Sequence, residues 1–214
     1  MINPINITDY GRSDYQLEEF LLFCIMVAGK RADTTSRALD DFLRWIKPSD
    51  QHQMTPFTII KNFRHEGDRD SAPAIRALDG ALRAYNKLHP GSGIGQYGRM
   101  ARAFWEAANL PYDLREVELK DLMRVHGIGP KTARLFLLHT RQNQRLAVLD
   151  VHVLRYIKGR LGEDAWVPST TPSNPNHYAE LEQFVLRFAD EAGMTPAQFD
   201  LWVWTQFAVA YKEQ

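Results

Sequence analysis

Residues 122–156 read LMRVHGIGPKTARLFLLHTRQNQRLAVLDVHVLRY, and the rest of the chain is organised around them. The turn Gly127-Ile128-Gly129 interrupts an apolar helical pattern, and Pro130 follows at the first position of a new one. Proline suits that position because its fixed φ matches a helix and its missing N–H would have no partner there. The pattern predicts a helix that begins at Pro130 and runs to about His139.

The turn between the two predicted helices has the features of an anion site. Two glycines let the backbone adopt positive φ and approach another molecule closely, because neither carries a Cβ. The helix that follows presents free N–H groups and the positive end of its dipole, which suit phosphate. Ile128 is expected to pack inward and hold the turn. Residues 118–140 therefore predict a helix-hairpin-helix, which grips a nucleic-acid backbone without reading bases.

A second motif follows the hairpin. The apolar run Leu146–Leu149 ends at Asp150, which stands where the N-cap of the helix VHVLRYIKGRL is expected. Asp150 follows Lys131 by nineteen residues. A lysine just after the hairpin and an aspartate opening the next helix at this spacing resemble the helix-hairpin-helix DNA glycosylases, a superfamily that includes endonuclease III and 8-oxoguanine DNA glycosylase.

The resemblance implies base-excision chemistry at Lys131 and Asp150. Removal of a damaged base breaks its bond to C1′ of deoxyribose, and a nearby carboxylate stabilises the positive charge that develops on the sugar. Lys131 would attack C1′ and form an imine, and the imine would permit β-elimination, so the enzyme would be both a glycosylase and an AP lyase. Simpler interpretations stay open, because Lys131 could merely contact phosphate and Asp150 could merely cap its helix.

The favoured substrate is an oxidised purine, 8-oxoguanine, because the compact length and the segment Tyr178–Trp204 resemble small 8-oxoguanine glycosylases. A flipped base needs a pocket in which to stack. Candidates for its lining are Lys30, His152, Asp200, Trp202 and Trp204. Predicted contacts with the DNA backbone are Gly127, Ile128, Gly129, Thr132, Arg134 and Arg99. The hairpin carbonyls could hold a monovalent cation, as the family's hairpins do; no other metal and no cofactor are expected.

The sequence departs from the family pattern in two respects. Several endonuclease III relatives hold an iron–sulfur cluster, whereas this chain has a single cysteine, Cys24, within an apolar run. Many members carry a glutamine after the first long helix to fill the gap left by the flipped base. Here the corresponding place reads Ala28-Gly29-Lys30, so the gap-filling residue is not identified from the sequence.

The charges are unevenly distributed, although the net charge of the 214 residues is zero. Residues 99–162 have twelve basic and six acidic side chains, whereas residues 163–214 have two basic and eight acidic ones. The basic surplus coincides with the hairpin, which favours DNA as the partner, although a solvated charged face would look the same.

Helical spacing recurs along the chain, and the one candidate for a strand is Leu146–Leu149. We expect an all-α fold of two helical lobes, with the helix-hairpin-helix and the active-site cleft at their junction. Residues 1–214 would form a single glycosylase unit, with lobes at about 30–150 and at 1–29 plus 151–214. No apolar run is long enough to cross a bilayer and no signal peptide is evident, so a cytoplasmic, nucleoid-associated monomer is expected.

Two alternatives remain. An enzyme of the endonuclease III type would act on oxidised pyrimidines. A non-catalytic helix-hairpin-helix module would bind DNA and release no base. The expected partner is double-stranded DNA, which contains a damaged base in both enzymatic interpretations.

Overall fold

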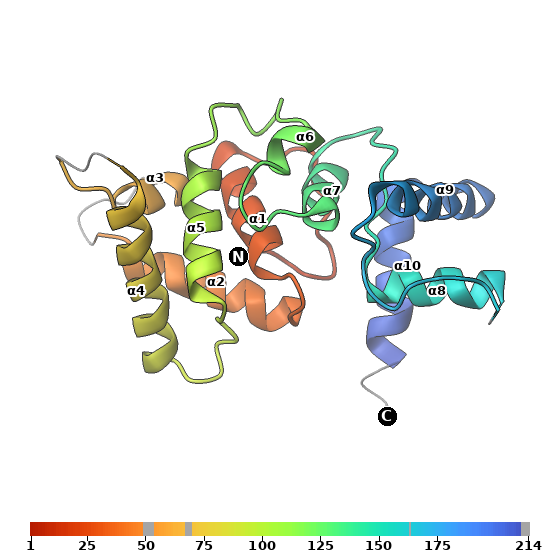
Figure 1. Cartoon of the computed structure of the whole chain (residues 1–214), viewed down its shortest axis with the longest axis horizontal. Helices are drawn as coiled ribbons and strands as arrows, with labels where there is room; N and C mark the ends of the chain where they lie inside the picture. Colours follow the sequence, from red (N-terminus) through yellow and green to blue (C-terminus); the bar gives the residue numbers. More distant parts are fainter. Residues whose placement is uncertain (49–53, 67–69, 163, 211–214) are drawn as a thin grey trace. The chain divides into compact units, whose positions relative to one another are not determined.

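The computed structural model describes residues 1–48, 54–66, 70–162 and 164–210. Within these ranges the regular structure is helical and contains no strand, which confirms the all-α class. The helices of these ranges are α1 (Asp14–Met26), α2 (Ala32–Ile46), α3 (Pro56–Lys61), α4 (Ala72–Leu88), α5 (Tyr97–Ala108), α6 (Leu119–Leu122), α7 (Pro130–Thr140), α8 (Val151–Leu161), α9 (Pro175–Glu191) and α10 (Pro196–Ala210) (Figure 1). None of these helices is long and apolar enough to span a membrane.

The helices form two compact units. Unit 1 comprises residues 1–4 and 11–133, and unit 2 comprises residues 5–10 and 134–214. The division falls between Ala133 and Arg134, inside α7. The lobes expected from the sequence, with limits near residues 29 and 150, stay a prediction.

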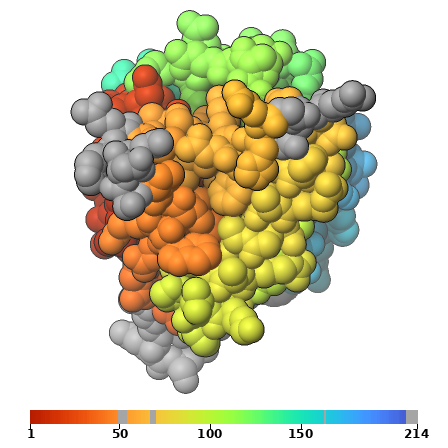
Figure 2. All heavy atoms as spheres, turned by 90° about the vertical axis from the view of Figure 1, so that its left-hand side faces the viewer, coloured from red at the N-terminus to blue at the C-terminus, as the bar shows by residue number. Residues whose placement is uncertain are grey.

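Unit 1 is built around α1. Ser13 and Gln16 form a capping box at its start, in which each side chain bonds the backbone N–H of the other residue. The helix is apolar on nearly all sides from Leu17 onward and is buried there, as such a helix must be. It contacts α2, α3 and α5. Figure 2 shows α2 (orange) and α4 (yellow) side by side on one face of this unit.

Unit 2 contains α8, α9 and α10, which contact one another around a shared apolar core. That core includes Leu149, Val153, Ile157, Tyr178, Leu181, Val185, Phe199 and Val203. The side chain of Asn174 caps α9, and Thr195 and Gln198 form a reciprocal capping box at the start of α10. Local capping chemistry therefore sets where the helices of this unit begin.

Candidate nucleic-acid interface and catalytic residues

The hairpin turn lies in unit 1, between the four-residue α6 and the start of α7. Gly127 adopts a φ of 79°, and Ile128 is buried and holds the turn as predicted. Gly129 does not adopt positive φ, which corrects the expectation that both glycines would. A Cβ added at Gly129 would meet no atom within 4 Å. Neither φ nor space within the protein therefore requires glycine at position 129, and its open surroundings fit the close approach of another molecule.

Arg99, from α5, braces the hairpin turn. Its guanidinium donates to the Gly127 carbonyl at 2.9 Å and to Oε1 of Gln96 at 2.6 Å. A Cβ on Gly127 would stand 2.9 Å from Nε of Arg99, so glycine is required here for space as well as for φ. The contacts described for Arg99 are thus with the hairpin itself and with Gln96. Contacts of Arg99 with DNA and of the turn with a cation stay predictions.

Lys131 is the second residue of α7 and is partly exposed. Among the residues that the structure describes, none engages its ammonium group in a hydrogen bond or an ion pair. Burial raises the pKa of the neighbouring Cys24 thiol far above its usual range, and the charges of Arg12 and Lys131 oppose this only in part. Cys24 is therefore a neutral, buried thiol. The next residue, Thr132, is also buried.

Lys30 lies in unit 1, where it lines a small cavity with Gln96, Arg99 and the end of α1. The cavity measures about 10 Å³, enough for a single water molecule. Within the described part of the chain, the buried Nζ of Lys30 has no hydrogen-bond partner. Burial lowers the pKa of Lys30, and the charge of Arg99 lowers it further. This amine is therefore held in surroundings that disfavour its charged form.

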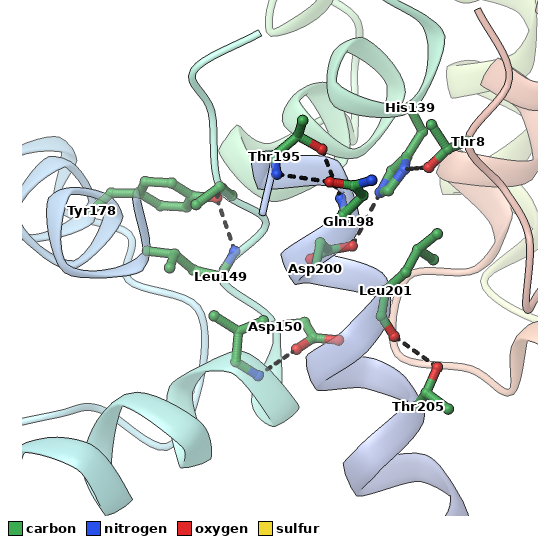
Figure 3. Close-up of polar contacts among 12 residues, drawn as sticks. Thr8, His139, Leu149, Asp150, Tyr178, Thr195, Gln198, Asp200, Leu201 and Thr205 are labelled. Carbon is green, nitrogen blue, oxygen red and sulfur yellow. Dashed lines mark hydrogen bonds and ion pairs between the residues drawn. The ribbon is translucent and has the colours of Figure 1, made fainter. Parts of the chain in front are cut away.

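Asp150 lies in unit 2 and caps α8. Its Oδ1 accepts hydrogen bonds from the N–H groups of His152 and Val153, both at 2.9 Å. Figure 3 shows Asp150 with one of these contacts. This confirms the N-cap predicted from the sequence and fixes the orientation of the carboxylate. Because Lys131 belongs to unit 1, the predicted lysine–aspartate pair is divided between the two units.

The segment Leu146–Leu149, which leads to Asp150, is neither helix nor strand. Side chains bond its buried backbone groups where a strand partner would otherwise do so. Glu182 accepts from the Ala147 N–H at 2.8 Å, and the Tyr178 hydroxyl donates to the Ala147 carbonyl at 2.9 Å. The same hydroxyl accepts from the Leu149 N–H at 3.2 Å (Figure 3). The apolar run that suggested a strand is thus a buried connection tied to α9.

Arg134, a predicted DNA contact, lies in an enclosed ion pair of unit 2. Its guanidinium donates to both carboxylate oxygens of Glu182, at 2.8 and 3.1 Å, and stands 4.2 Å from the centre of the Tyr178 ring. The Arg134 and Glu182 side chains are only 12% and 9% exposed. A phosphate contact by Arg134 would therefore require the loss of a bidentate, largely buried partner.

Asp200, a candidate for the base pocket, is held by a residue that the sequence did not reveal. Nε2 of His139 lies 3.0 Å from Oδ2 of Asp200, and its Nδ1 lies 2.7 Å from Oγ1 of Thr8 (Figure 3). His139 is completely buried. Thr8 and His139 are 131 positions apart, so no local pattern could have paired them. The arrangement ties residues 5–10 to α7 and α10 within unit 2.

The remaining pocket candidates also lie in unit 2, whereas Lys30 lies in unit 1. Trp202 is half-exposed and packs on Tyr156 and Phe199, with ring centroids 5.6 and 5.7 Å away. Trp204 is partly exposed. In the described ranges, the buried Nδ1 of His152 has no hydrogen-bond partner. Four of the five pocket candidates therefore lie in unit 2: His152 on α8, and Asp200, Trp202 and Trp204 on α10.

No family model matches the sequence. The structure is similar to the crystal structure of the 8-oxoguanine DNA glycosylase of Thermotoga maritima, with a TM-score of 0.61 and 24% sequence identity. The match covers 91% of this chain and 81% of the Thermotoga chain. The chain therefore shares the fold of that enzyme, as the sequence resemblance implied.

Proposed function

We propose that this chain is a DNA glycosylase with AP lyase activity, and that its preferred substrate is duplex DNA containing 8-oxoguanine. The observation that carries the proposal is the ammonium group of Lys131, which none of the described residues engages in a hydrogen bond or ion pair, directly after a hairpin turn suited to backbone phosphate. The shared fold with the Thermotoga enzyme supports the same class of reaction. Because one fold can host many functions, the amine carries more weight than the fold.

The reaction assigns one step to each of two side chains. Nζ of Lys131, in its neutral form, attacks C1′, and the bond from C1′ to the base breaks with its electrons leaving on the base, which takes up a proton. The Asp150 carboxylate stabilises the positive charge on the sugar. The sugar ring then opens to an imine between C1′ and Nζ. Loss of a C2′ proton finally expels the 3′ phosphate and cleaves the strand.

Borohydride trapping tests this assignment, because the reduction joins protein to DNA covalently only where a carbon–nitrogen double bond links them. A panel of duplexes, each with one oxidised purine, one oxidised pyrimidine or no lesion, is incubated with the protein and borohydride. We expect a covalent adduct and strand cleavage with 8-oxoguanine. Lys131→Gln should abolish both and retain most of the affinity for lesion DNA. Lys120→Gln is the matched control, since this exposed lysine of α6 is paired with Glu118 at 2.8 Å.

Each of the other outcomes would indicate a different activity. Cleavage confined to oxidised pyrimidines would indicate an enzyme of the endonuclease III type. Base release without an adduct would indicate a glycosylase that uses water as the nucleophile. An adduct that persists in Lys131→Gln would move the amine elsewhere, with Lys30 tested first. Binding with no base release from any duplex would contradict the proposal and leave a DNA-binding module.

A further inference from the structure

The direction of the Asp150 carboxylate depends on two anchors. One is α8, whose first N–H groups bond Oδ1. The other is the segment Leu146–Leu149, which directly precedes Asp150 and so determines where the backbone of Asp150 lies. A segment without helix or strand has no ladder of its own backbone bonds to hold it. Its position therefore depends on the packing of Ala147 and Leu149 in the apolar core and on the groups that bond its buried N–H and C=O groups.

Those bonds come chiefly from one face of α9. Tyr178 and Glu182 are four positions apart, so their side chains leave the same face of the helix. Between them they bond the N–H and the carbonyl of Ala147 and the N–H of Leu149, and all three contacts are buried. Thr171 adds a fourth bond, from its hydroxyl to the Leu149 carbonyl at 2.7 Å.

The two α9 side chains are themselves held in place. The Arg134 guanidinium donates to both carboxylate oxygens of Glu182 and lies over the Tyr178 ring. Burial raises the pKa of Tyr178, so its hydroxyl keeps the proton that it donates to Ala147. A single hydroxyl thus donates to one backbone group and accepts from another, which only a protonated tyrosine can do here.

We infer that Tyr178 and Glu182 are positioning residues for the Asp150 carboxylate, because they hold the segment that delivers it to the cap of α8. The inference rests on the proposed catalytic role of Asp150. It assigns to α9 a part in the reaction although neither residue touches the reacting atoms. Arg134 contributes by holding the Glu182 carboxylate in place.

Two variants test the inference through the rate of base release in a single turnover. Tyr178→Phe removes the hydroxyl and keeps the ring, and Glu182→Gln removes the charge and keeps an acceptor. We expect each to slow base release by about tenfold or more, since a displacement of about 1 Å can cost about a hundredfold. Affinity for lesion DNA should stay within about twofold, as neither change removes a phosphate contact. Thr171→Val is a third, milder variant should Tyr178→Phe not fold.

Asp190→Asn is the matched control. Asp190 is another carboxylate of α9 held bidentately by an arginine, Arg145, at 2.8 Å for both bonds. Its pair is exposed, and among the described residues its carboxylate bonds the Arg145 side chain and no backbone group of residues 146–149. Its rate of base release should equal that of the wild type. A loss in Asp190→Asn as large as in Glu182→Gln would overturn the inference.

Amide hydrogen exchange provides a readout that does not depend on activity. Tyr178→Phe should expose the amides of Leu149, His152 and Val153 to faster exchange, while α10 keeps its protection. A variant with a lower Tm but unchanged base release and unchanged exchange at these amides would show a merely structural role. If the wild type releases no base from any duplex, the proposed function fails. The inference is then judged on exchange alone, and unchanged protection of His152 and Val153 overturns it.

Discussion

Asp150 combines two tasks that a single substitution can separate. As an N-cap it accepts two backbone hydrogen bonds through Oδ1, and asparagine can make the same bonds. As a carboxylate it carries the charge that the proposed reaction needs, and asparagine does not. The geometry of the cap and the chemistry of the site therefore depend on different properties of one side chain.

We predict that Asp150→Asn folds and binds lesion DNA like the wild type but releases base about a hundredfold more slowly or worse, the usual loss for a removed electrostatic stabiliser. Single-turnover kinetics measure the rate, and a thermal melt measures the fold. Asp150→Ala should lose about 1 kcal/mol of stability as well, because alanine cannot cap. Full activity in Asp150→Asn would show that Asp150 only caps α8 and takes no part in the reaction.

Lys30 is destabilising while it is charged, because its Nζ is buried and burial lowers its pKa. The unfolded chain then binds this proton more tightly than the folded protein does. Stability therefore rises as the pH climbs from the lowered pKa toward the ordinary lysine value of about 10.4. Below the lowered pKa the full penalty is present.

We predict that Lys30→Met stabilises the protein at pH 7 by up to about 1 kcal/mol, the low end for a buried polar group without hydrogen bonds. The gain should shrink at pH 10, where the wild type has shed part of the penalty. Melts at the two pH values, without DNA, measure both effects. Lys61→Met, at an exposed lysine of α3, should change neither. A gain in stability that is the same at both pH values would come from packing alone.

The hairpin is the element in which two similar residues have different tasks. Gly127 has positive φ and the Arg99 side chain against it, whereas Gly129 has neither. The first glycine is therefore needed to form the turn. At the second, a Cβ would meet no atom within 4 Å, and its contact with the DNA backbone stays a prediction.

We predict that Gly127→Ala costs about 1–2 kcal/mol, the penalty of a Cβ in the left-handed region, and more if Arg99 cannot move aside. Gly129→Leu should leave the Tm nearly unchanged yet weaken binding to lesion and intact duplexes by the same factor, because phosphate contacts position without specifying. Chemical denaturation and fluorescence anisotropy measure the two effects. A loss in Gly129→Leu confined to one lesion would contradict a backbone contact.

For the whole molecule, most of the basic surplus of residues 99–162 is already neutralised within each unit. Seven of its twelve basic side chains form ion pairs with acidic residues, namely Arg102, Arg115, Lys120, Arg124, Arg134, Arg145 and Arg160. These ion pairs lower the number of cations that residues 99–162 can offer to phosphate while the pairs stay closed.

We predict a shallow salt dependence for the DNA contacts of residues 99–162. While the seven ion pairs stay closed, at most five of the twelve basic side chains of this segment can meet phosphate. The segment should therefore contribute a slope no steeper than about −4.5 to the fall of the logarithm of the binding constant with the logarithm of salt concentration, since each neutralised phosphate contributes about −0.9. Anisotropy titrations between 50 and 300 mM salt, about the range in which such slopes are linear, measure it. A much steeper slope would mean that the ion pairs open on binding.

The features that sequence alone could reveal are those made by near neighbours in the chain. Pro130 begins α7 and Asp150 caps α8, as their positions predict. Each involves groups within about four residues, so the pattern contains all the partners. The all-α class follows from the same local periodicity.

The remaining features depend on which elements fold against each other. Arg134 meets Glu182 forty-eight positions away, and Thr8 meets His139 across 131. The φ of each hairpin glycine and the space around it depend on the path of the chain and on the residues packed nearby. The sequence Gly-Ile-Gly therefore could not show that Gly127 and Gly129 differ. Whether Lys30 is solvated, or Leu146–Leu149 pairs as a strand, is likewise set by what packs around it. Burial and pairing over such separations belong to the tertiary structure, because the free energy of a charged or polar group depends on its surroundings more than on its type.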